Sequence, residues 1–203
     1  TQRDNPSMYL KTLIIVLWLF SAWAFVLFAP VIFPVRLLGC MVLAIAVAAF
    51  SFNVGHDANH NAYSSNPHIN RVLGMTYDFV GLSSFLWRYR HNYLHHTYTN
   101  ILGHDVEIHG DGAVRMSPEQ EHFSMYRFQQ FYIWGLYLFI PFYWFLYDVY
   151  LVLNNGKYHD HKIPPFQPLE LVSLLAIKLL WLGYVFGLPL ALGFSITEVL
   201  IVA

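Results

Sequence analysis

Two long stretches without a charged side chain constrain this chain more than any other feature. There are 24 consecutive uncharged residues between Lys11 and Arg36, and 20 more between Arg36 and Asp57. About 20 apolar residues are enough to cross the hydrocarbon core of a bilayer. We therefore predict two transmembrane helices, at residues 11–29 and 36–54.

The rest of the chain also points to a membrane protein. Hydrophobic residues make up 57% of it and charged residues only 11%, whereas soluble domains carry about 25% charged residues. Pro30 and Pro34 mark a tight turn between the first two spans. Residues 171–192 form a third predicted span, in which we expect Lys178 to snorkel towards water. The predicted fold class is all-α, an integral membrane helical protein with about three and a half spans.

The two ends of the sequence suggest a fragment of a longer protein. The chain begins at Thr1 without a methionine, and it stops at Ala203 inside an apolar run. Residues 195–203 are therefore predicted to begin a fourth span.

Residues 55–127 are too polar to cross a membrane. They hold five of the eleven Lys and Arg residues and nine of the eleven histidines. The excess of arginine predicts a cytoplasmic position by the positive-inside rule. Within this region, residues 69–85 are predicted to form an amphipathic helix on the membrane surface. The net charge of −1 gives no indication of a nucleic-acid partner.

A strongly aromatic segment follows. Residues 128–147 carry no charge, more than half of them are aromatic, and Pro141 interrupts the run. Tyrosine and tryptophan rings prefer the boundary between membrane and water. The pattern favours an interfacial segment over residues 128–153 rather than a full crossing, followed by a polar loop at 154–168.

Five histidines form two clusters in the polar region. His56 and His60 are four residues apart, so on an α-helix they share a face. His91 and His95 repeat that spacing, and His96 is expected about 100° further round the helix. Two such clusters at the mouth of a helical hairpin indicate a metal site.

The metal can be narrowed by chemistry. Imidazole suits Zn, Cu, Fe and Ni. A haem needs ligands on opposite ring faces, and a transporter should have its ligands inside the spans. A catalytic zinc needs about three protein ligands, which would leave the second cluster surplus. Five histidines grouped as two and three fit a binuclear centre better.

These segments resemble the histidine boxes of a known family. Residues 55–64 (GHDANHNAYS) and 90–100 (RHNYLHHTYTN), with the continuation at 103–108 (GHDVEI), are similar to the first and second boxes of membrane fatty-acid desaturases. The similarity is greatest to a bacterial branch that resembles acyl-CoA and front-end lipid desaturases. By matching position, the resemblance implies that the iron ligands include His56, His60, His91, His95 and His96.

The family implies a four-span fold with a non-haem di-iron centre and all boxes on the cytoplasmic side, here of a bacterial inner membrane. It also implies O2, an acyl-lipid or acyl-CoA substrate, and an external electron donor, ferredoxin or cytochrome b5. A third box of the form H/Q-x-x-H-H is absent from the sequence, so we expect this fragment alone to be inactive. Because that box must also be cytoplasmic, the family pattern supports an interfacial segment at 128–153.

Acidic side chains are expected to orient the imidazoles through their second ring nitrogen. The candidates are Asp57, Asp105 and Glu107, and we expect Asp57 to serve a histidine other than His56. Six further histidines are expected on the surface, with His104 the strongest exception: His68, His104, His109, His122, His159 and His161. Two alternatives stay open, a lipid hydroxylase on the same scaffold and a membrane metal-binding protein without turnover.

Overall fold

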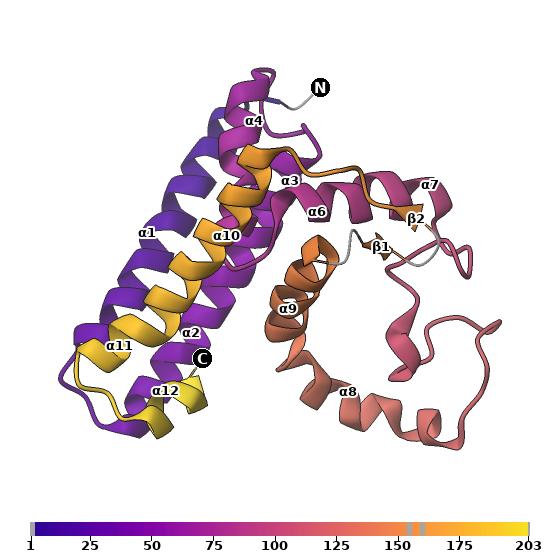
Figure 1. The fold of residues 1–203 in the computed structure, drawn as a ribbon. Helices are drawn as coiled ribbons and strands as arrows, with labels where there is room; N and C mark the ends of the chain where they lie inside the picture. Colours follow the sequence, from indigo (N-terminus) through magenta and orange to yellow (C-terminus); the bar gives the residue numbers. More distant parts are fainter. Residues whose placement is uncertain (1–2, 154–155, 159–160, 203) are drawn as a thin grey trace. The chain divides into compact units, whose positions relative to one another are not determined.

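The computed structural model describes residues 3–153, 156–158 and 161–202 (Figure 1). The chain divides into two compact units, Thr1–Val80 with Leu175–Ala203, and Gly81–Leu174. The helical content and the apolar helices confirm the predicted all-α membrane fold class.

The first unit is a bundle of apolar helices with a polar end. Its elements are α1 (Pro6–Phe28), α2 (Phe33–Phe50), the π-helix η1 (Ser51–Gly55), α3 (His56–Asn59), α4 (Pro67–Gly74), α5 (Thr76–Phe79), the π-helix η5 (Gly183–Gly187), α11 (Leu188–Ala191) and α12 (Ile196–Val202). Helix α10 (Pro168–Leu182) begins in the second unit and continues into the first.

The helical hairpin α1–α2 is defined by its caps and by one small residue. Asn5 accepts a hydrogen bond from the Ser7 backbone N–H at 3.0 Å, and Pro6 fills the first turn of α1. A Cβ added at Gly39 would lie 2.8 Å from the Phe25 ring, so glycine permits close packing of the two helices. From the first turn of α2, Arg36 donates to the Ala29 carbonyl at the end of α1 at 3.2 Å.

Within the described residues, three helices are long and apolar enough to cross a membrane. They are Pro6–Phe28, Phe33–Asn59 and Glu170–Ala191, and they overlap the three predicted spans. Lys178, in the third helix, is buried at 4% exposure. The expectation of a snorkelling lysine was therefore wrong, because protein covers this side chain.

The second unit carries the second histidine cluster and a bent pair of helices. Its elements are α6 (Ser84–Trp87), the π-helix η2 (Arg88–His95), α7 (His96–Tyr98), the 3₁₀-helices η3 (Gly110–Gly112) and η4 (Ser124–Phe128), α8 (Gln129–Tyr137), α9 (Ile140–Leu153), β1 (Lys157–Tyr158) and β2 (His161–Lys162). The two strands pair antiparallel, in the segment predicted to be a loop. The core of this unit contains Leu86, Leu94, Leu151, Tyr158, Ile163 and Leu174.

Two segments are broken more than the sequence suggests. The amphipathic helix predicted at 69–85 is instead divided among α4, α5 and the start of α6, so that prediction was wrong in extent. The segments Ser124–Tyr137 and Ile140–Leu153 meet at a bend of 74°, as in a broken span or a re-entrant loop. The break falls just before Pro141, whose ring disfavours continuation of the preceding helix.

Candidate metal centre

Both histidine boxes are associated with π-helical turns, which the spacing of the histidines did not predict. The His56 N–H donates to the Ser51 carbonyl at the end of η1, and the His96 N–H donates to the His91 carbonyl at the end of η2. Each bond joins residues five apart, where an α-helix would join residues four apart. Such wide turns within helices are frequent at functional sites.

The first box brings two imidazoles together at the end of the second apolar helix. The ring centroids of His56 and His60 are 4.4 Å apart, and one nitrogen of each lies within 4.8 Å of the other. The Asp57 carboxylate lies 3.5 Å from Nδ1 of His56. The expectation that Asp57 serves a different histidine was therefore wrong, since its carboxylate turns back to the preceding residue.

A buried asparagine inside the first box holds it in place. Asn59 is 2% exposed, and its amide donates to the Gly74 carbonyl of α4 at 3.0 Å. A Cβ at Gly74 would lie 2.7 Å from Oδ1 of Asn59, so only glycine permits this approach. Asn59 was not predicted as a site residue, although a polar residue between the two histidines was the available signal.

The second box gathers three imidazoles within one short helical segment. The ring centroids of His91 and His95 are 5.1 Å apart, those of His91 and His96 are 4.9 Å apart, and those of His95 and His96 are 5.4 Å apart. On an α-helix His96 was expected about 100° further round the helix than His95. The wider π-turn instead brings both the fourth and the fifth residue after His91 close to its ring.

Asp105 anchors the middle imidazole of this cluster. Its side chain is fully buried, and its two oxygens lie 3.0 and 3.1 Å from Nδ1 of His95. The same carboxylate accepts from the backbone N–H groups of Asn100 and Glu107. An imidazole that donates from Nδ1 keeps the lone pair of Nε2 available for a metal.

Glu107 is the second carboxylate of this cluster, and its side chain is partly buried at 29% exposure. Its Oε1 lies 3.0 Å from Nε of Arg90 and 3.5 Å from Nδ1 of His91. Burial raises the pKa of Glu107, but the hydrogen bond from His91 and the charge of Arg90 lower it more, so the net pKa is below the usual value. Glu107 is therefore held as a carboxylate beside the box.

The six histidines outside the boxes were expected on the surface, and His104 was the strongest candidate for an exception. Nδ1 of His104 lies 3.2 Å from Nε2 of His161 in β2. Both rings pack near Tyr98, with centroid distances of 5.2 and 5.3 Å. His159 lies outside the described residues.

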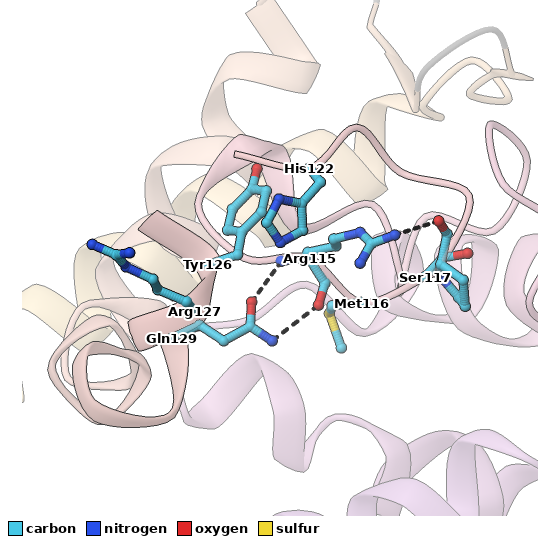
Figure 2. A pocket seen from close by; sticks show the side chains of 8 residues that line it. Arg115, Met116, Ser117, His122, Tyr126, Arg127 and Gln129 are labelled. Carbon is cyan, nitrogen blue, oxygen red and sulfur yellow. Dashed lines mark hydrogen bonds between the residues drawn. The ribbon is translucent and has the colours of Figure 1, made fainter. Parts of the chain in front are cut away.

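A cavity of about 340 Å³ lies in the polar region, and the residues that line it include none of the box histidines. Its lining includes Arg115, His122 and Arg127, which suggests an anion site by composition. Figure 2 shows that the two arginine side chains point in opposite directions, and Arg115 is occupied by the carbonyl of Gln120 at 3.0 Å. The cations do not converge, so the cavity lacks the geometry of an anion site.

The model of the fatty acid desaturase family matches residues 32–203, which include both boxes and their carboxylates. The chain belongs to the fatty acid desaturase family.

Several curated desaturases resemble this family member along nearly its whole length. It is 96% identical over 201 residues to a sn-1 linoleoyl-lipid 6-desaturase of Synechocystis sp.. The aligned region covers 99% of the chain and 56% of that protein. It is 50% identical over 199 residues to a sn-1 linoleoyl-lipid 6-desaturase of Arthrospira platensis, covering 98% of the chain and 54% of that protein. The chain thus spans about half the length of these relatives. No solved structure matches it.

More distant desaturases keep the resemblance. An acyl-lipid (8-3)-desaturase of Physcomitrium patens is 27% identical over 191 residues, covering 93% of the chain and 40% of that protein. The desaturase family implies iron-dependent catalysis. The donor set fits this metal, because the described boxes supply imidazoles, and in the second box Asp105 bonds Nδ1 of His95, which leaves Nε2 for a ligand bond.

Proposed function

We propose that the protein to which this chain belongs is a lipid desaturase, which puts a double bond into an acyl chain of a membrane lipid using O2 and iron. The observation that carries the proposal is the three-histidine cluster of the second box, with one imidazole fixed by the buried Asp105. The family match and the names of the similar proteins agree with it.

We assign the metal ligands to the box histidines, and we take the centre to be di-iron. Those ligands are His56, His60, His91, His95 and His96. Iron supplies the oxidising power that an unactivated methylene C–H bond requires, because no protein acid or base can break such a bond. The chain itself supplies oriented imidazoles and a water-poor place for the acyl chain.

The acidic residues act through the histidines. The Asp105 carboxylate accepts a hydrogen bond from Nδ1 of His95, with 3.0 Å between Oδ1 and Nδ1. This bond fixes both the tautomer and the orientation of the ring. Glu107 does the same for His91 at a longer distance of 3.5 Å. Asp57, also 3.5 Å from His56, is more exposed, so we assign it the weakest of the three roles.

The substrate proposal rests on the similar proteins. Two of them are named sn-1 linoleoyl-lipid 6-desaturases, one at 96% identity. We infer that this protein acts on a linoleoyl chain attached to a lipid, rather than on an acyl-CoA, and that the new double bond forms at carbon 6.

We also infer a multi-pass protein of the bacterial inner membrane, with both boxes facing the cytoplasm. There an external ferredoxin or cytochrome b5 would deliver two electrons for each turnover. The arginines support this orientation, since one, Arg36, lies in the turn between the first two spans and five lie in the box region: Arg71, Arg88, Arg90, Arg115 and Arg127.

The test is lipid analysis of cells that express the full-length protein with an electron donor and linoleate. Gas chromatography with mass spectrometry should show a new double bond at carbon 6, and His95→Ala should abolish it. His68→Ala is the matched control, because His68 lies outside the boxes and is exposed. A hydroxylated chain would identify a hydroxylase on this scaffold. Unchanged lipids, despite full expression, would favour a binding protein.

A further inference from the structure

Helix α9 is attached to the second histidine box at several points along one face. Trp144, Asp148 and Leu151 are spaced four and three residues apart, so they lie along one stripe of the helix. Asp148 is buried and accepts a hydrogen bond from the Ser83 backbone N–H at 3.0 Å, at the start of α6. Leu151 is completely buried in the core that also contains Leu86 and Leu94.

The third attachment of this stripe reaches the box itself. Cζ of Arg90 lies 3.4 Å from the centroid of the Trp144 ring, within the range of a cation–π interaction. Arg90 belongs to η2, one residue before His91, and is only 7% exposed. Its Nε lies 3.0 Å from the Glu107 carboxylate, which in turn lies 3.5 Å from Nδ1 of His91.

These contacts form a chain of four side chains from three segments, namely Trp144, Arg90, Glu107 and His91. A buried guanidinium is costly unless its charge is compensated. Here the carboxylate compensates it at the edge and the indole ring compensates it on the face. Removing the ring would leave Arg90 partly uncompensated and able to move, and Glu107 would lose a fixed partner.

We propose that Trp144 and Arg90 are positioning residues that set the orientation of His91 through Glu107. This inference rests on the proposed role of His91 as an iron ligand. Trp144 itself touches no box histidine in the contacts described above. Its effect on the metal is therefore indirect, and groups that orient a metal-ligating histidine typically change metal affinity by about 10- to 100-fold.

The test measures the iron affinity of the full-length protein in detergent, by competition with a coloured Fe²⁺ chelator. Trp144→Met and Trp144→Phe are compared, because methionine and phenylalanine have similar volumes and only phenylalanine offers an aromatic face to the Arg90 guanidinium. We expect Trp144→Met to lower the affinity by about tenfold and Trp144→Phe to retain most of it. Tyr150→Leu is the control, since this ring on α9 is 56% exposed.

His91→Ala separates the two proposals. If His91→Ala weakens iron binding and Trp144→Met does not, the positioning role is overturned and the ligand assignment stands. Equal losses in Trp144→Met and Trp144→Phe would show that volume matters and the aromatic face does not, which also overturns it. If His91→Ala binds iron as the wild type does, the ligand assignment itself fails.

Discussion

At the residue scale, the buried acceptors distinguish the second box from ordinary exposed histidines. Asp105 accepts from one imidazole and two backbone N–H groups, and Glu107 is shared between Arg90 and His91. Asp105 and Glu107 lie two residues apart in the same short loop, so this loop positions both carboxylates. A local change in this loop should therefore affect both imidazoles.

Asp105→Asn tests that dependence. The amide keeps the size of the carboxylate but loses its charge, and its NH2 group cannot accept from His95, Asn100 or Glu107. We expect iron affinity to fall by about 10- to 100-fold and the free energy of unfolding to fall by about 1–3 kcal/mol, because buried groups lose their partners. Chelator competition and thermal unfolding in detergent measure the two effects. An unchanged iron affinity would contradict the orienting role.

Individual residues were partly predictable from the sequence. The five box histidines and the carboxylates Asp105 and Glu107 were predicted from spacing and from family resemblance; the structure places Asp105 beside His95 and Glu107 near His91, and their roles at a metal stay predictions. Asn59 was missed because its role depends on a close approach to Gly74, fifteen residues later. The burial of Lys178 was equally invisible, since it depends on what packs around a helix and not on the helix itself.

At the scale of elements, the π-turns are the main departure from the sequence-based expectation. A pair of histidines four apart predicts one shared face only if the helix is α. In η2 the i to i+5 bond from His96 to His91 changes that periodicity. No residue pattern signalled the wider turn, whereas the uncharged runs predicted where the first two long apolar helices lie, with ends that differ by up to five residues.

Gly74→Ala tests the packing of α3 on α4. The added methyl would lie 2.7 Å from the Asn59 amide oxygen, so Asn59 must move and its hydrogen bond to α4 weakens. We expect the free energy of unfolding to fall by about 1–3 kcal/mol, with weaker iron binding. Gly135→Ala in α8 is the control, because a Cβ there meets no atom within 4 Å. Equal melting temperatures for the two variants would contradict this packing role.

At the scale of the whole molecule, the membrane topology depends on the bent helices α8 and α9. In the part of the chain that the structure describes, three helices can cross a bilayer by length and composition, and the bent pair would be a fourth if it is one span. A crossing would place the chain before α8 and the chain after α9 on opposite sides of the membrane. An interfacial or re-entrant pair would leave them on the same side.

Single cysteines placed in a cysteine-free form of the full-length protein decide between these topologies. Ile32→Cys lies in the turn between α1 and α2, Glu119→Cys precedes α8, and Lys162→Cys follows α9. A membrane-impermeant maleimide added to intact cells should label only Ile32→Cys, because the positive-inside rule puts the box region in the cytoplasm. Glu119→Cys and Lys162→Cys should both react only after the cells are opened. Labelling of Lys162→Cys in intact cells would show that α8 and α9 cross the membrane, and the segment following α9 would then lie on the side opposite the box histidines.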